Sequence, residues 1–286
     1  MARLWKGAPV AAALSERVAA QVERLKQRGV SPALAIVRVG QRPEDLSYER
    51  GALKRCEMVG ITVKQFILPD TVELTELLHI VEAINQDAAI HGCLLFRPLP
   101  RHLDEAAVCA ALAPSKDVDG ITAGSLAGVF AGSGSGFPPC TAQACLEILD
   151  YYGYELTGKR AVVVGRSLVI GKPAAMLLLQ RNATVTLCHT RTADLAAECR
   201  RADVLIAAAG KAGMLGVSHI APGQAVIDVG INLDADGMLV GDVDFAAAEP
   251  VADAVTPVPG GVGAVTTSVL ARHVAEAAAR LHGLGG

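Results

Sequence analysis

Short apolar segments alternate with helix-length amphipathic segments along most of this 286-residue chain. The segment ALAIVRV at 33–39 predicts a buried strand that ends at Gly40, and Pro43 suits the first turn of a following helix. Gly60 predicts the end of that helix near residue 59. A strand at 62–68, a helix at 72–85 and a strand at 92–96 follow. Strands separated by helices need crossover connections, so the pattern predicts an α/β fold with parallel sheets.

A second alternating series follows a segment rich in small residues, GSLAGVFAGSGSGFPP at 124–139. We expect this segment to be a loop that forms a domain boundary or an active-site rim, or else a plain surface linker. Beyond it the pattern predicts helices at 141–151, 173–181, 193–201 and 268–281, and strands at 161–164, 184–188, 204–208 and 225–229. A chain of this length holds about two domains. We expect a first domain over 1–140, joined by the C-terminal helix 268–286, and a second over 141–267.

Composition supports the α/β prediction and argues against several classes of function. Aromatic residues make up 3% of the chain and hydrophobic residues 51%, so the core is aliphatic rather than aromatic as in many β-sandwiches. A net charge of -3 without a basic run argues against a nucleic-acid partner. Seven cysteines without a C-x-x-C pair argue against disulfides and zinc, and favour a cytoplasmic protein. No segment approaches the ~20 apolar residues that span a membrane, and no residue set has metal-ligand spacing.

The first functional motif opens the second series. Residues 162–173, VVVGRSLVIGKP, are typical of a strand, a glycine turn and the start of a helix. Glycines let the backbone approach a ligand closely, and a helix start attracts negative charge. The spacing is G-x5-G rather than G-x-G-x-x-G, so a simple tight turn is the alternative. We predict a dinucleotide-binding site that includes Gly165, Arg166 and Ser167.

The end of the next strand indicates which dinucleotide binds. NAD enzymes usually place an acidic residue about 20 residues further on, where it holds the ribose 2′-hydroxyl. Here residues 188–192 read CHTRT, with no acid before Asp194. Arg166, Thr190 and Arg191 are suited to a 2′-phosphate that a carboxylate would repel, so we predict NADP. His189 alone is interpreted as a structural histidine.

Several longer motifs occur along the chain. They are VG at 39–40 with Pro43 and Tyr48, CE at 56–57 with VGI at 59–61, PLP at 98–100, KDVDG at 116–120, PCT at 139–141, GRS at 165–167 with Gly171 and Pro173, DVGIN at 228–232 and TPVPGGVG at 256–263. In these motifs and their order the chain resembles the methylenetetrahydrofolate dehydrogenase/cyclohydrolase family over nearly its whole length. The KDVDG and TPVPGGVG strings are too long for a chance match.

The resemblance implies a homodimer whose subunits have two α/β domains flanking a cleft, the first binding folate and the second, of Rossmann type, binding NADP. It implies oxidation of 5,10-methylenetetrahydrofolate to the 5,10-methenyl form, followed by addition of water to give 10-formyltetrahydrofolate. Asp119 falls on the family's folate-binding Asp, which accepts hydrogen bonds from the pterin. The resemblance also implies that Pro259, Gly260 and Gly261 bind substrate, and that Ile231 reaches the cofactor through its backbone.

The chain departs from the family at two catalytic positions. The family pairs a Tyr with a Lys four residues later on one helical face, and adds a Gln at the end of the third strand. Here Tyr48 is retained, but Ala52 stands at the Lys position and Phe96 at the Gln position. Lys54 lies six residues after Tyr48, about 120° away around a helix, so its spacing does not replace the missing Lys.

We expect the oxidation and the water-addition reaction to be impaired to different extents. Hydride loss leaves a cation that two nitrogens stabilise, so it depends mainly on alignment. Water addition and ring opening need proton transfer, which neither Ala52 nor Phe96 provides. We therefore predict an NADP-dependent methylenetetrahydrofolate dehydrogenase with weak or absent cyclohydrolase activity.

Three alternatives remain at this point. One is a bifunctional enzyme in which Lys54 or Arg97 substitutes for the lost groups. Another is a paralogue that binds folate or NADP with little turnover, or that acts on a related pterin. The third is a two-domain NADP oxidoreductase of the shikimate or amino-acid type, against which the KDVDG and TPVPGGVG strings argue.

Overall fold

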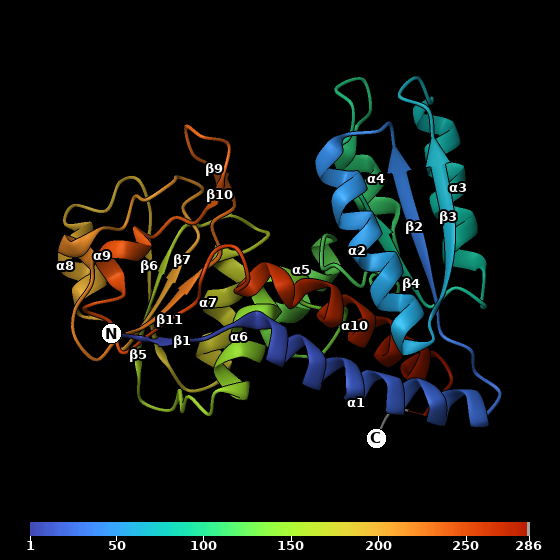
Figure 1. Ribbon diagram of the computed structural model, residues 1–286. Helices are drawn as coiled ribbons and strands as arrows, with labels where there is room; N and C mark the ends of the chain where they lie inside the picture. The colour runs from blue at the N-terminus through green and yellow to red at the C-terminus, as the bar shows by residue number, and fades with distance from the viewer. Residues whose placement is uncertain (285–286) are drawn as a thin grey trace. The chain divides into compact units, whose positions relative to one another are not determined.

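The computed structural model describes residues 1–284 and divides into two compact units (Figure 1). One unit, here called the 12–140 unit, also contains the C-terminal segment from Thr267. The other, the 141–266 unit, also contains residues 1–11. The boundaries fall within α1 (Gly7–Gln27) and at the start of α10 (Thr266–Leu281). Both units are α/β, as the alternation of apolar and amphipathic segments predicted.

The 12–140 unit is built on a three-stranded parallel sheet in the order β3-β2-β4. Its strands β2 (Ala33–Val39), β3 (Thr62–Leu68) and β4 (Gly92–Leu95) confirm the predicted strands to within one residue. Helix α2 (Pro43–Val59) connects β2 to β3, and α3 (Leu74–Gln86) connects β3 to β4. The central strand β2 is buried along its whole length, as expected for a strand covered on both faces.

Side chains of this sheet alternate between two faces. Ala35, Val37 and Val39 of β2 belong to an apolar cluster with residues of α3 and α4 (Glu105–Ala111). The residues between them, such as Ile36 and Arg38, therefore point to the opposite face. Helix α2 covers that face (Figure 1). The two faces have different roles, because only the α2 face carries the candidate catalytic residues.

The prediction that 124–139 is a loop is wrong for its first half, which forms α5 (Ala123–Ala131). The Thr122 hydroxyl accepts a hydrogen bond from the Ser125 N–H at the start of this helix, and Gly132 ends it in the left-handed conformation. Small residues were mistaken for loop formers, but here they permit close packing. A Cβ at Gly128 would overlap the carbonyl oxygen of Ser135.

The 141–266 unit contains a six-stranded parallel sheet in the order β1-β11-β8-β7-β5-β6, with the strand arrangement of a Rossmann-type domain. Four strands confirm the prediction, namely β5 (Arg160–Val164), β6 (Thr184–Cys188), β7 (Val204–Ala207) and β8 (Ala225–Asp228). The helices are α6 (Cys140–Tyr151), α7 (Gly171–Gln180), α8 (Leu195–Arg200) and the short α9 (Phe245–Ala248). A small antiparallel hairpin, β9 (Asn232–Leu233) with β10 (Leu239–Val240), and two 3-10 turns, η1 (Val217–His219) and η2 (Val262–Ala264), complete the unit.

The first residues of the chain join the second sheet. Strand β1 (Arg3–Leu4) pairs with β11 (Ala254–Val255), and two-residue strands are too short to show a sequence period. Trp5 is 2% exposed and stacks on Tyr152, with ring centroids 5.2 Å apart. The edge of Tyr154 meets the same indole at 5.8 Å. Residues 1–11 therefore pack with residues 141–266, whereas the sequence analysis placed them with the first domain.

This packing predicts that Trp5→Ala destabilises the 141–266 unit by about 3–5 kcal/mol, the usual cost of deleting a buried aromatic side chain. Denaturant unfolding measures the loss, and hydrogen exchange of β1 and β11 locates it. Leu4→Ala is the matched control, because Leu4 is 40% exposed and its loss is expected to cost less than about 1 kcal/mol. Equal losses for the two variants would contradict the role given to Trp5.

Candidate active site

Tyr48 and Phe96 lie against each other on the α2 face of the three-stranded sheet. Their ring centroids are 6.0 Å apart and their planes cross at 81°, an edge-to-face contact. Phe96 follows β4 directly and is 8% exposed, while Tyr48 is half-buried on α2. Ala52, one helical turn after Tyr48, is completely buried. An aromatic ring and a methyl group therefore stand at the two positions that the sequence analysis aligned with the family's Gln and Lys.

The two residues considered as substitutes for the family's Lys and Gln are an exposed lysine and an arginine that is paired with an acid. The Lys54 side chain is exposed on α2. The Arg97 guanidinium lies 3.4 Å from the Glu105 carboxylate, which also accepts a hydrogen bond from the Leu99 N–H at 2.9 Å. Arg97 is thus directed toward the start of α4 rather than toward α2.

The KDVDG turn uses two of its charged side chains to build the turn itself. The Lys116 ammonium donates to the carbonyl oxygens of Ile84 and Asp87 at 2.6 and 2.7 Å. The fully buried Asp117 carboxylate accepts the N–H groups of Ile121 and Thr122 at 3.0 and 2.7 Å. Asp119 is the one charged side chain of the motif that these contacts do not explain.

Asp119 is half-buried beside Cys140, the first residue of α6. Burial raises the pKa of Asp119 to about 6; the hydrogen bond from the Cys140 thiol opposes the shift, the Asp117 charge adds to it, and the Arg97 charge opposes it. The carboxylate therefore changes its charge near neutral pH. When ionised, it is suited to accept hydrogen bonds from N–H groups of a ligand.

The glycine turn after β5 has the geometry of a phosphate cradle. Gly165 has φ 126°, and a Cβ there would overlap the carbonyl oxygen of Ala208. A Cβ at Gly171 would overlap the Gly165 carbonyl, so the turn leads directly into α7. The Ser167 hydroxyl accepts the Ile170 N–H at 3.1 Å and shapes the turn. Backbone amides at a helix start are a favourable site for the phosphates of a dinucleotide.

The residues predicted to bind a 2′-phosphate reach the same edge of the sheet. The Gly165 N–H donates to the Cys188 carbonyl at 2.9 Å, which joins the ends of β5 and β6. The side chains of Arg166, Thr190 and Arg191 are exposed there. His189 shapes the turn, since its Nδ1 accepts the Arg191 N–H at 3.1 Å.

The first acid after β6, Asp194, is used inside the fold. Its carboxylate accepts the Ala197 N–H at 2.9 Å and so caps α8. It is therefore committed to the helix rather than to a ribose. This end of the site suits the phosphate of NADP better than the 2′-hydroxyl of NAD.

Two buried aspartates order the loops that follow β7 and β8. The Asp242 carboxylate accepts three successive backbone N–H groups, from residues 209–211, at 2.5–2.9 Å. It also accepts the Asn232 side-chain amide at 2.9 Å. Sequence reasoning missed Asp242, although an acid directly between Gly241 and Val243 was the available signal.

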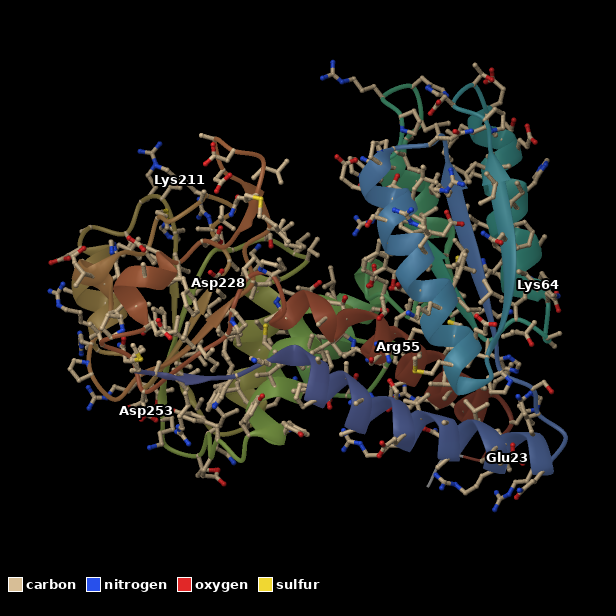
Figure 2. All side chains as sticks on the ribbon, in the orientation of Figure 1. Glu23, Arg55, Lys64, Lys211, Asp228 and Asp253 are labelled. Carbon is tan, nitrogen blue, oxygen red and sulfur yellow. The ribbon has the colours of Figure 1, made fainter. Side chains whose placement is uncertain are left out.

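Asp228 stabilises the same loops. Its carboxylate accepts the N–H groups of Gly230, Asp242 and Val243 at 2.9–3.0 Å. Burial raises the pKa of Asp228 to about 6 against the effect of these hydrogen bonds. Ile231, 72% exposed, follows directly on the ordered segment. Figure 2 shows Asp228 inside the unit and Lys211 at its surface.

The glycine-rich turn of TPVPGGVG is held by backbone contacts. Gly260 has φ 102°, and its carbonyl accepts the Gly7 N–H at 2.8 Å. A Cβ at Gly261 would lie 2.5 Å from the Pro257 carbonyl oxygen. Pro259 and Gly260 are exposed and Gly261 is buried. These three residues belong to the 141–266 unit, whereas Tyr48, Phe96 and Asp119 belong to the 12–140 unit.

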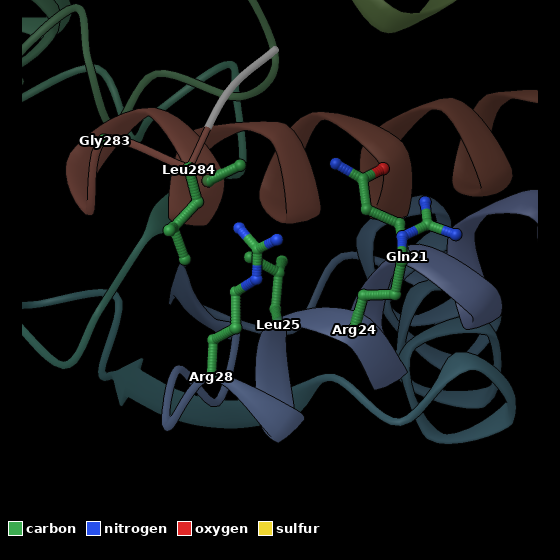
Figure 3. Close-up of a pocket in the computed structure, with 7 residues that line it drawn as sticks. Gln21, Arg24, Leu25, Arg28, Gly283 and Leu284 are labelled. Carbon is green, nitrogen blue, oxygen red and sulfur yellow. The ribbon is translucent and has the colours of Figure 1, made fainter.

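A separate hollow of about 490 Å³ lies between α1 and the end of α10 (Figure 3). It is lined by Gln21, Arg24, Leu25, Arg28, Ala279, Gly283 and Leu284, none of which is a candidate site residue. Within residues 1–284, no group of His, Cys, Asp and Glu side chains is arranged to hold a metal ion. In the same range no helix has both the length and the apolar character needed to cross a bilayer.

The fold and the glycine turn define a two-domain α/β protein with a dinucleotide-binding second domain. The family model of the tetrahydrofolate dehydrogenase/cyclohydrolase catalytic domain matches residues 5–119, and that of the corresponding NAD(P)-binding domain matches residues 139–282. The chain belongs to this family, as its motifs predicted. The alternative of a shikimate or amino-acid type oxidoreductase is therefore wrong.

Similar proteins cover the chain from end to end. The bifunctional protein FolD of Carboxydothermus hydrogenoformans is 51% identical over 286 residues, covering 99% of this chain and 100% of the relative. The structure of the bifunctional FolD enzyme of Campylobacter jejuni has a TM-score of 0.94 at 35% identity, covering 98% of this chain and 99% of that one. The Trypanosoma brucei FolD structure, complexed with NADP cofactor and an inhibitor, has a TM-score of 0.91 at 34% identity, covering 98% of each chain.

The glycine turn predicts that Gly165→Ala weakens NADP binding at least tenfold, because Gly165 has no room for a Cβ and its φ is unfavourable for other residues. Titration calorimetry measures the affinity. Gly216→Ala is the matched control in the same unit, because its Cβ would meet open space. Unchanged affinity in Gly165→Ala, with the fold intact by circular dichroism, would exclude the turn as the cofactor cradle.

Proposed function

We propose that the chain is an NADP-dependent 5,10-methylenetetrahydrofolate dehydrogenase with weak or absent cyclohydrolase activity. In this proposal the 12–140 unit binds the folate, the 141–266 unit binds NADP, and the protein acts as a homodimer in the cytoplasm. Family membership supports the substrate class. The seven cysteines, all with free thiols, support a reducing compartment.

The choice of NADP rests on the exposed cluster at the ends of β5 and β6. Arg166, Thr190 and Arg191 would hold the 2′-phosphate, and Asp194 is occupied as a helix cap. Gly165, Ser167 and the start of α7 would hold the pyrophosphate, and Ile231 would contact the cofactor through its backbone. When bound, NADP supplies the oxidising nicotinamide that accepts the hydride. A relative with 34% identity has been crystallised with NADP cofactor.

The protein residues that would contact the folate mainly need to orient it. Asp119 would accept hydrogen bonds from the pterin N–H groups, while Tyr48 and the turn at Pro259, Gly260 and Gly261 would contact the reacting part of the substrate. The C–H bond of the methylene carbon breaks with its electron pair, and the two flanking nitrogens stabilise the cation that remains. No proton transfer from the protein is required, so alignment provides most of the acceleration.

One observation carries the prediction of weak cyclohydrolase activity. The Tyr48 ring meets the Phe96 ring, and Ala52, one helical turn after Tyr48, is buried. Neither Phe96 nor Ala52 has a proton to exchange or a polar atom to hold water. Addition of water to the methenyl carbon and opening of the ring both need such a group.

A second candidate function is the bifunctional enzyme, which the names of the similar proteins favour. In that case a residue other than those at positions 52 and 96 moves the proton. Exposure of Lys54 and pairing of Arg97 with Glu105 weigh against the two substitutes considered from the sequence.

An absorbance assay with methylenetetrahydrofolate and either NADP or NAD separates the two candidates. We expect methenyl formation with preference for NADP, followed by decay of the methenyl signal at the spontaneous rate. Decay well above that rate would establish the bifunctional enzyme. Absence of methenyl formation would leave a folate- or NADP-binding paralogue.

The same assay applied to Ala52→Lys/Phe96→Gln tests the cause of the loss. We expect cyclohydrolase activity to rise by about 10²–10⁴-fold, the usual contribution of a positioned acid or base. Ala52→Met with Phe96→Gln is the control, because Met fills similar space without a proton. No gain in the Lys variant would show that the two replaced residues are not the whole explanation.

The pKa of Asp119 predicts a pH dependence of folate use. Burial raises this pKa to about 6, so the acid is protonated as the pH falls through that value and loses its ability to accept two N–H groups. We expect kcat/KM for methylenetetrahydrofolate to fall about tenfold per pH unit below that value. Asp119→Asn is expected to have a low kcat/KM at all pH values and to lose this pH dependence. The pKa of Asp228 lies in the same range. If the pH dependence survived in Asp119→Asn, it would therefore belong to a group other than Asp119.

A further inference from the structure

Helix α2 has little apolar anchoring in the half that carries Tyr48. The buried residues of the helix are Asp45, Glu49, Ala52, Cys56 and Val59. The two in the N-terminal half, Asp45 and Glu49, are acids, and Ala52, just past the middle, has only a methyl group. Asp45 pairs with Arg42, three residues earlier, at 2.7 Å, so it holds the helix start rather than the sheet. Polar contacts must therefore help to hold this part of α2 against the sheet.

Glu49 connects this half of the helix to two strands. Its Oε2 accepts the Arg38 Nε–H of β2 at 2.7 Å, and its Oε1 accepts the Gln65 amide of β3 at 2.6 Å. The side chains of Arg38 and Glu49 are 8% and 5% exposed. Arg38 also donates to the Gly40 carbonyl oxygen just beyond the strand. The result is a buried ion pair with both carboxylate oxygens in use.

Arg38 lies next to Phe96 on the sheet. Strands β2 and β4 pair with Val37 opposite Leu95, and the cluster with α3 and α4 contains both of these residues. The residues that follow, Arg38 and Phe96, are therefore cross-strand neighbours on the α2 face. The Phe96 N–H donates to the Val37 carbonyl at 3.0 Å and continues the pairing.

Two consecutive residues of α2 contact these two neighbours. Glu49 binds Arg38, and Tyr48 packs edge-to-face on Phe96. A rotation or slide of the helix that broke the ion pair would also displace the Tyr48 ring. The ion pair and the ring contact are thus two parts of one attachment.

We propose that Arg38 and Glu49 are positioning residues that set the rotation of α2 and thereby hold Tyr48 in place for hydride transfer. This inference rests on the proposed function, because it gives Tyr48 a role in that reaction. A buried ion pair adds little net stability compared with apolar side chains of similar volume. Its charge-assisted hydrogen bonds, however, accept only a narrow range of geometries.

Replacement of the pair by apolar side chains separates positioning from stability. Arg38→Met/Glu49→Leu is expected to fold cooperatively with a Tm near that of the parent, while kcat for methenyl formation falls about tenfold or more. The KM for NADP is expected to stay within about twofold. Amide hydrogen exchange over 43–52 is expected to accelerate, with 53–59 unchanged. Unchanged kcat and unchanged exchange would overturn the proposal.

The matched control is Lys64→Met on β3. Lys64 forms an exposed ion pair with Asp87 at 2.9 Å (Figure 2), and its loss is expected to change neither kcat nor exchange in α2. Arg38→Lys keeps the charge but not the Nε–H geometry, so partial recovery of kcat relative to the double variant is expected. No recovery, with exchange at the parent rate, would contradict the positioning role.

A double-mutant cycle shows whether the effect passes through Tyr48. Glu49→Gln and Tyr48→Phe are measured singly and together, and we expect the effect of Glu49→Gln on kcat to shrink at least threefold in the Tyr48→Phe background. Additive effects would overturn the proposal, because a purely structural role predicts them. If the parent enzyme formed no methenyl product, the proposed function would fail, and the exchange measurement on α2 would still decide whether the pair sets the helix.

Discussion

Parallel pairing is the constraint on which both sites of this protein depend. Every strand of the two larger sheets runs in the same direction as its neighbours, so all carboxyl ends within one sheet lie along one edge. That edge is where α/β sheets bind ligands. Phe96 follows β4, the glycine turn follows β5, and the turn with Thr190 and Arg191 follows β6. Register matters for the same reason, since a shift of one residue would move Arg38 and Phe96 off the α2 face.

Positions 52 and 96 of the 12–140 unit both carry buried apolar side chains. Position 52 is completely buried, and a lone Lys there would lose hydration and be driven toward its neutral form. The family resemblance implies a Gln that would hold such a Lys by a hydrogen bond. Phe96, at that position here, cannot form one. Under the proposed function, hydride transfer would tolerate these side chains better than proton transfer would, because hydride transfer depends mainly on alignment.

Strong periodicity made much of the fold predictable from the sequence. The strands at 33–39, 62–68 and 184–188 were found to the residue. The clearest is 33–39, an apolar run between Pro32 and Gly40 that has few alternatives. The helix at 123–131 was missed because small residues that serve close packing look like those of a loop. Strands β1 and β11 were missed because two residues carry no period.

Candidate site residues could be predicted where they belong to sequence motifs. The buried residues that hold them in place could not. Arg38 stood inside a strand predicted to be buried, which was a signal that it needed a partner. Its partner Glu49 lies on the next helix, at a distance in sequence that no local pattern links to it. Asp242 similarly reaches a loop more than thirty residues earlier. Long-range pairing of buried charges depends on the completed fold, so the sequence shows the charge without its partner.

Both units hold their functional loops and helices with buried carboxylates rather than with apolar side chains alone. Glu49 binds two strands beneath the helix that carries Tyr48, and Asp242 binds three successive backbone amides beside Ile231. Apolar burial is strong but non-directional, so it leaves a helix or loop free to slide by fractions of an ångström. Hydrogen bonds to a buried carboxylate are directional, and losing one leaves an unpaired charge at high cost. The proposed dehydrogenase, which would act mainly by alignment, would gain most from directional supports of this kind beneath its candidate site residues.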